Sequence, residues 1–175
     1  MELGLLRMME RKRFSEISVA ELCQELGVPR KAFYRYFDSK EGALHALLDH
    51  TLMEMENVYM AYPEGKGPVD SQKAMERLFR EWYDRRELIT VLEHCGLLGV
   101  LTECAIRFSA EHKTVSNFLR DGDPQMNQYA TTFINSGLMA ILFQWHCSGY
   151  ATSVEDMAKL ALRLFREPLF APKRK

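Results

Sequence analysis

Residues 26–44 read LGVPRKAFYRYFDSKEGAL, and this stretch decides the fold. Between Arg30 and Lys40 it holds four cations, two tyrosines and two phenylalanines. A buried helix rarely contains so many charged residues, and an ordinary surface helix rarely contains so many aromatic rings. Because Phe33 and Phe37 are four residues apart, they share one helical face and can pack on a core. We therefore expect a helix that is held down by its phenylalanines and turns its cations and tyrosines toward an anionic partner.

The residues on either side of this stretch predict a helix-turn-helix. Ser18, with Glu21 three positions later, is the sequence signature of a capping box at a helix start. One apolar stripe follows at Val19, Leu22, Cys23 and Leu26. Gly27 suits a left-handed residue at a helix end, and Pro29 suits the start of the next helix. Residues 18–37 therefore form two helices joined by a short turn, the arrangement that places its second helix in the major groove of DNA.

The rest of the chain also reads as helix, since no strand-like alternation of apolar and polar residues occurs. The predicted helices cover residues 2–12, 18–26, 29–37, 39–61, 70–84, 86–95, 97–112, 114–120, 125–147 and 154–166. The clearest break is PEGKGP at residues 63–68. The predicted fold class is all-α, with an N-terminal three-helix domain over residues 1–48 and a C-terminal helical domain over residues 49–175.

Composition limits the classes of partner. The 175 residues carry a formal net charge of -1, so any affinity for nucleic acid must come from a local cationic patch. The four cysteines show no paired spacing, which is typical of free thiols in a reducing cytoplasm. The longest apolar run is far too short to span a bilayer. We expect a cytoplasmic protein with no membrane partner.

Residues 14–44, FSEISVAELCQEL followed by GVPRKAFYRYFDSKEGAL, closely resemble the DNA-binding signature of TetR-like (tetracycline-repressor-like) transcriptional regulators. The matching positions are Ser18, Val19, Leu22, Gly27, Val28, Phe33, Tyr34, Phe37, Ser39, Lys40, Glu41 and Leu44. The resemblance implies a double-stranded DNA operator as partner and a set of DNA-binding residues: Ser18, Arg30, Lys31, Ala32, Tyr34, Arg35, Tyr36 and Lys40, the last on the DNA backbone. Pro29 and Ala32 depart from the family, which commonly has Ser and Thr there, so one hydroxyl contact is missing.

A second, weaker resemblance covers residues 133–162, FINSGLMAILFQWHCSGYATSVEDMAKLAL. It is similar to the closing helices of shorter family members, which dock with their mates in a dimer. The resemblance implies a homodimer through Ile134, Leu138, Ile141, Trp145, Met157, Ala161 and Leu164. The alternative is that both helices are buried within one chain, and the amphipathic pattern by itself does not decide between the two.

The C-terminal domain also contains side chains suited to a pocket for a small apolar or aromatic effector. Trp82, Tyr83 and Phe108 are the candidates, although such residues equally fill a core. His94–Cys95 and His146–Cys147 do not suit a zinc site, because adjacent helical residues point about 100° apart. With no nucleophile–base set and no phosphate-binding glycine loop, we expect no enzyme, no metal and no cofactor.

The function predicted from the sequence is a DNA-binding transcriptional regulator. It would act as a repressor, bind a near-palindromic operator as a dimer and be released by a small-molecule effector. The alternative is a dimeric helical small-molecule-binding protein that has lost DNA binding. A mobility-shift assay on the DNA upstream of its own gene separates the two.

Overall fold

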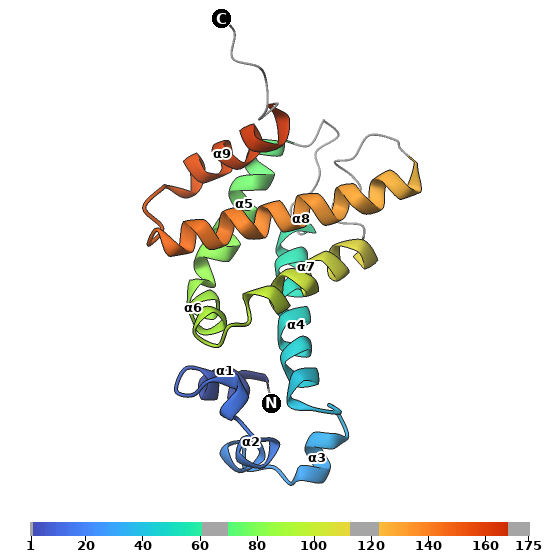
Figure 1. The fold of residues 1–175 in the computed structure, drawn as a ribbon, viewed down its shortest axis with the longest axis vertical. Coiled ribbons are helices and arrows are strands. Elements are labelled where there is room, and N and C mark those ends of the chain that lie inside the picture. The colour runs from blue at the N-terminus through green and yellow to red at the C-terminus, as the bar shows by residue number, and fades with distance from the viewer. Residues whose placement is uncertain (1, 61–69, 113–122, 168–175) are drawn as a thin grey trace, which may run out of the picture. The chain divides into compact units, whose positions relative to one another are not determined.

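The computed structural model describes residues 2–60, 70–112 and 123–167. Every regular element among these residues is helical, which confirms the all-α prediction (Figure 1). The elements are α1 (Glu2–Met9), the 3-10 turn η1 (Phe14–Glu16), α2 (Val19–Glu25), α3 (Arg30–Tyr34), α4 (Lys40–Met60), α5 (Ser71–Asp84), α6 (Arg86–His94), α7 (Leu98–His112), α8 (Pro124–Cys147) and α9 (Val154–Arg166). The predicted break at residues 63–68 and the predicted helix at 114–120 lie outside the described residues.

Most predicted helices are observed with ends displaced by one or two residues, but α1 and α3 are clearly shorter. α1 ends at Met9, and the chain then enters η1, which the sequence pattern did not predict. α3 covers Arg30–Tyr34 because Pro29 is extended, with φ -66° and ψ 145°, and stands before the helix as its cap residue. α3 therefore begins at the first of its cations.

The chain forms two compact units, which divide it inside α4. The first unit comprises Met1–Glu54 and Glu87–Phe108, and so contains α1, α2, α3, nearly all of α6, and most of α4 and α7. The second comprises Met55–Arg86 and Ser109–Lys175, and contains α5, α8 and α9. α4 runs without interruption through residue 48, where the sequence placed the boundary between domains.

The core of the first unit is built around α4. Its apolar face is buried at Ala43, Leu44, Leu47, Leu48 and Leu52, the spacing expected of a helix with one face in a core. α1 approaches α2 closely at Gly4, where an added Cβ would lie 2.2 Å from Leu26 Cδ2. This close approach brings the first helix onto the helix-turn-helix.

The second unit is organised by Trp145 of α8. Its indole Nε1 donates to the carbonyl of Thr152 at 2.9 Å, which fixes the turn between α8 and α9. Its ring packs edge-on against Phe79 of α5 at 5.6 Å between centroids and against Tyr150 at 4.9 Å. α9 lies alongside α5 (Figure 1), so α5, α8 and α9 share one core. Within the described ranges, no helix has the length and apolar character that crossing a membrane requires.

Candidate nucleic-acid interface

The first helix of the motif begins with the predicted capping box. The Ser18 hydroxyl accepts a hydrogen bond from the Glu21 backbone N–H at 3.2 Å, and the Glu21 carboxylate accepts from the Ser18 backbone N–H at 2.9 Å. The hydrogen bond from the Ser18 backbone, together with those from Lys12 and the Ser18 hydroxyl, lowers the pKa of Glu21 from 4.5 to about 2. The carboxylate stays charged over most of the acid range and keeps α2 capped.

The turn between the two helices follows from the left-handed conformation of Gly27, whose φ is +64°. Its N–H donates to the Gln24 carbonyl at 3.1 Å, and the Val28 N–H donates to the Cys23 carbonyl at 3.0 Å. This pair of bonds is a Schellman motif, which satisfies the last carbonyls of a helix and requires φ above zero at its glycine. The turn thereby directs the chain into Pro29 and α3.

α3 divides its aromatic residues between the core and the surface. Phe33 is 0% exposed, and its ring lies 5.5 Å from the rings of both Tyr34 and Phe37. Tyr34 and Tyr36 are 54% and 60% exposed. The Arg35 guanidinium donates to the Tyr36 hydroxyl at 3.0 Å and lies over the same ring. The phenylalanines hold the segment on the core, as expected, and the tyrosines face outward.

The cations of this face differ from Arg11 and Lys12, two other cations of the first unit. Arg30, Lys31 and Arg35 are exposed, and none of them forms an ion pair with any residue the structure describes. By contrast, Arg11 pairs with Glu25 at 2.7 Å, and Lys12 pairs with Glu21 at 3.0 Å. The α3 surface is therefore a local positive patch in a chain whose net charge is close to zero.

Two of the predicted DNA-binding side chains are engaged inside the protein. The Ser18 hydroxyl serves the capping box, and the Lys40 ammonium donates to three backbone carbonyls of the segment before α2. Ala32 is half-buried and offers only a methyl group. The exposed remainder of the predicted set is Arg30, Lys31, Tyr34, Arg35 and Tyr36.

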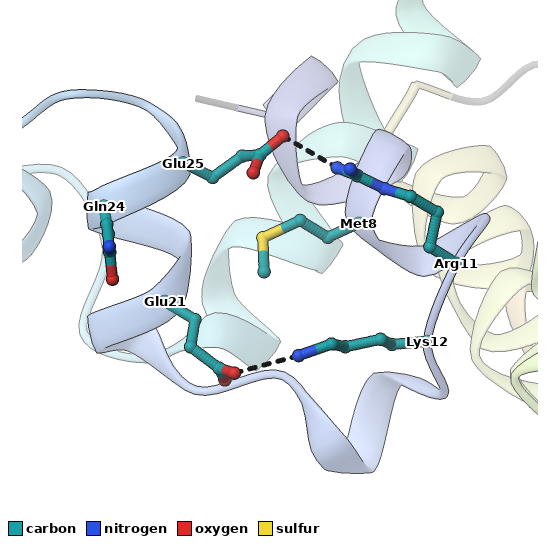
Figure 2. Close-up of a pocket in the computed structure, with 6 residues that line it drawn as sticks. All are labelled: Met8, Arg11, Lys12, Glu21, Gln24 and Glu25. Atoms are coloured by element: carbon teal, nitrogen blue, oxygen red, sulfur yellow. Dashed lines mark hydrogen bonds and ion pairs between the residues drawn. The ribbon is translucent and has the colours of Figure 1, made fainter.

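An open hollow lies between α1 and α2, close to the motif (Figure 2). Met8 forms part of its lining, and the side chains of Arg11, Lys12, Glu21, Gln24 and Glu25 complete it. Figure 2 shows the pairs Arg11–Glu25 and Lys12–Glu21 as dashed lines. Since each cation here has its own carboxylate, the hollow lacks the surplus of positive charge that a nucleic acid requires.

Two contacts that sequence reasoning missed join α4 to α7 in the first unit. Arg107 donates to both carboxylate oxygens of Asp49, at 2.6 and 2.8 Å, and the Sγ of Cys104 lies 3.3 Å from Nδ1 of His45. Burial raises the pKa of the Cys104 thiol. These pairs are 58 and 59 residues apart in sequence, so no local pattern could have indicated them.

Three of the predicted dimerisation residues are buried within the chain itself. Trp145, Met157 and Ala161 belong to the core of the second unit, as the alternative of helices buried within one chain expects, and their part in a dimer stays a prediction. Ile134, Leu138 and Ile141 are half-buried, and Leu164 is exposed. The structure adds a row of exposed apolar side chains on α8 that the sequence analysis had overlooked, although their helical spacing was a signal: Met126, Tyr129 and Phe133.

The three predicted effector-pocket residues do not all belong to one unit. Trp82 and Tyr83 lie on α5 in the second unit, and Phe108 lies on α7 in the first. Trp82 is buried, and its indole N–H has no hydrogen-bond partner among the described residues. The Tyr83 ring lies 5.8 Å from that of Trp145 and 5.3 Å from that of Tyr150.

Comparison with known proteins finds similarity over the helix-turn-helix segment. Residues 5–47 match the family described as bacterial regulatory proteins, tetR family. The HTH-type transcriptional regulator EthR of Mycolicibacterium smegmatis is 38% identical over 71 residues. That match covers 41% of this chain and 32% of EthR, about a third of the relative's length.

Two solved structures share the fold over nearly the whole chain. The dihydroxyacetone kinase operon activator DhaS has a TM-score of 0.54 at 14% identity and covers 93% of this chain and 90% of its own. The fatty acid degradation regulator FadR from Bacillus halodurans has a TM-score of 0.56 at 13% identity and covers 98% of this chain and 95% of its own. At such identities the likeness concerns the fold alone. The similarity to the TetR family of bacterial regulatory proteins therefore lies in the helix-turn-helix segment, over residues 5–47.

Proposed function

We propose that this protein is a transcriptional repressor that binds a near-palindromic operator as a homodimer and is released by a small effector. The observation that carries the DNA-binding step is the outer face of α3. There Arg30, Lys31 and Arg35 stand exposed without ion pairs among the described residues, while Phe33 beneath them is fully buried. Like charges held close together repel one another, and a polyanion relieves that repulsion.

The chemistry of this face suits duplex DNA. Guanidinium and ammonium groups donate to O6 and N7 of guanine in the major groove, and tyrosine hydroxyls donate to phosphate oxygens. Arg35 and Tyr36 are already hydrogen-bonded to each other at 3.0 Å, which limits the freedom of both side chains before binding. In this proposal Arg35 and Lys31 read bases, and Tyr34 holds the DNA backbone.

The proposed homodimer uses α8 and α9. Along α8, Tyr129 and Phe133 are exposed, and along α9, Leu160 and Leu164 are exposed. Large apolar side chains on the surface of a single chain mark interaction sites. A two-fold dimer would present two copies of α3 to successive major grooves, about 34–36 Å apart on one face of the duplex.

The proposed effector site lies in the second unit at Trp82. A buried indole N–H without a partner costs about 1–3 kcal/mol, so a ligand that accepts its hydrogen bond would recover that cost. We therefore propose an effector with an aromatic or aliphatic body and one hydrogen-bond acceptor, such as a carbonyl or carboxylate.

The experiment is DNA selection from a random duplex library, followed by affinity measurements on the selected sequence. Arg35→Ala should weaken binding by about 5- to 150-fold for each half-site, since each subunit loses about 1–3 kcal/mol with one bidentate base contact. Arg80→Ala is the matched control, because it removes one exposed cation that already pairs with Glu155 on the second unit. If the wild type selects no sequence, even at low salt, the alternative of a helical small-molecule-binding protein is favoured instead.

The sign of regulation is tested separately, since the structurally similar DhaS is described as an activator. A reporter gene placed behind the selected sequence should be more active when the protein is absent. Lower reporter activity in its absence would make the protein an activator.

A further inference from the structure

The ammonium of Lys40, in the first turn of α4, donates all three of its hydrogen bonds to backbone carbonyls. It donates to the carbonyls of Phe14 at 2.8 Å, Ile17 at 2.9 Å and Ser15 at 3.3 Å. An ammonium group has three donors, and the three carbonyls match that number. Nζ also lies 4.7 Å from the centroid of the Phe14 ring, within the range of a cation–π contact.

These carbonyls belong to a rigid piece of the first unit. The side chains of Phe14 and Ile17 are buried at the start of the helix-turn-helix, with Ile17 only 1% exposed. Ile17 directly precedes Ser18, the cap residue of α2. The lysine is therefore attached to the point where the motif begins.

Lys40 itself follows the point where the motif ends. α3 closes at Tyr34, and the turn through Arg35–Ser39 leads directly into α4. The hydrogen bond from Lys40 to Ile17 joins residues 23 positions apart and so closes α2, the turn and α3 into one loop. Holding both ends of a segment limits the orientations it can adopt, which lowers the entropy lost on binding.

We propose that Lys40 is a positioning residue for operator recognition: its ammonium ties the start of α4 to η1 and Ile17 and so fixes the orientation of α3, rather than contacting a DNA phosphate. A phosphate contact would require Nζ to leave at least one of its carbonyls, and the carbonyl left behind would be desolvated at a protein–DNA interface. This inference rests on the proposed DNA-binding function and replaces the backbone contact predicted for Lys40 from the sequence.

The test compares Lys40→Met with Lys31→Met. Methionine keeps most of the aliphatic stem and removes the charge and its donors in both variants. Lys31 is exposed and has no ion pair within the described residues, so it serves as the control for a cation that meets DNA. Three quantities are measured: the melting temperature without DNA, the dependence of affinity on salt, and the ratio of affinities for the library-selected duplex and a scrambled duplex.

Lys40→Met should lower the melting temperature by about 3–10 °C, since it removes hydrogen bonds from a charged donor. Measured well below that temperature, its salt slope should equal that of the wild type, while its ratio of selected to scrambled affinity should fall about tenfold. Lys31→Met should melt like the wild type and, because the proposed dimer loses one contact with DNA in each subunit, have a salt slope shallower by about 1.8.

Two results would overturn the proposal. An unchanged melting temperature with a salt slope shallower by about 1.8, from one lost contact in each subunit, would make Lys40 a phosphate contact. A lower melting temperature with unchanged discrimination would make it a structural link with no part in recognition. If the wild type itself binds no DNA, the proposed function fails first. Amide hydrogen exchange then still tests the structural role of the Lys40 hydrogen bonds. If they hold the helix-turn-helix in place, Lys40→Met must increase amide exchange across residues 18–37.

Discussion

Phe33 and Tyr34 are neighbours on α3, but Phe33 is buried in the core and Tyr34 faces outward. We therefore expect substitution of Phe33 to change mainly the stability of the fold and substitution of Tyr34 to change mainly the affinity for DNA. Phe33 is 0% exposed and packs against the rings of Tyr34 and Phe37. Phe33→Ala removes a fully buried ring, which costs about 3–5 kcal/mol in the free energy of unfolding. For a chain of this length that corresponds to a fall in melting temperature of about 6–20 °C. DNA binding should weaken only as far as the folded fraction decreases.

Tyr34→Phe is the matched change on the exposed side. It keeps the ring contact with Phe33 at 5.5 Å and removes only the hydroxyl of a side chain that is 54% exposed. The melting temperature should therefore stay within about 1–2 °C of the wild type, as for other surface substitutions. Affinity for the selected duplex should fall several-fold with loss of a phosphate hydrogen bond, about 1 kcal/mol.

Circular dichroism melts and fluorescence anisotropy titrations with labelled duplex give both quantities for each variant. If Tyr34→Phe melted as low as Phe33→Ala, or bound DNA like the wild type, our division of α3 into a buried and a DNA-facing side would be wrong.

Three further predictions concern the cap of α2, the exposed face of α8 and the buried indole. Glu21→Gln should lower the melting temperature at neutral pH and make it decline less on acidification. The pKa of Glu21 is about 2 in the folded protein against its ordinary value of 4.5, so the stabilisation from its carboxylate is present above pH 4.5 and is lost as the pH falls toward 2. Melting temperatures from about pH 2 to 6 that run parallel to those of the wild type would refute this. Phe133→Asp should give folded monomers by light scattering, since this side chain is 71% exposed in a single chain, and a stable dimer carrying it would place the interface elsewhere. Trp82→Phe removes a buried donor that has no partner among the described residues, and it also removes part of a buried ring, whose loss costs about 1–3 kcal/mol. The melting temperature without ligand should therefore fall by no more than about 12 °C, and a larger fall would show that the N–H has a partner in solution.

The helix-turn-helix could be predicted from the sequence because its determinants are local. Ser18 and Glu21 are three residues apart, and Gly27 acts through its own backbone conformation, so each signal can be read within one turn of helix. The same holds for the aromatic pattern of α3. These features depend on residue type and spacing, which a sequence states directly.

The packing of α8 and α9 could be predicted only in part, because an apolar stripe has the same sequence pattern in a core and in an interface. Trp145 recurs at helical spacing with Ile141, yet its indole is committed to the Thr152 carbonyl and its ring to Phe79 and Tyr150. Only the packing of α5 against α8 and α9 shows which side of each helix is already occupied. Phe133 lies on the same helix with similar apolar neighbours in the sequence, yet its side chain is exposed and that of Trp145 is buried.

Lys40 shows a further limit of reading charge from sequence. A lysine in the first turn of a helix, beside a recognition helix, is expected to meet phosphate, because helix N-termini favour anions. Its actual partners are carbonyls of residues 14, 15 and 17, and a backbone carbonyl has the same chemistry whatever residue carries it. The residue type alone does not distinguish a lysine whose N–H groups already donate to backbone carbonyls from a lysine whose N–H groups remain available to a ligand. The distinction matters for the charge of the proposed DNA-binding face, because its cations without an ion pair among the described residues are then Arg30, Lys31 and Arg35. Salt dependence should accordingly reflect contacts from these three side chains of each subunit, and Lys40 should influence recognition only through the position of the helix that carries them.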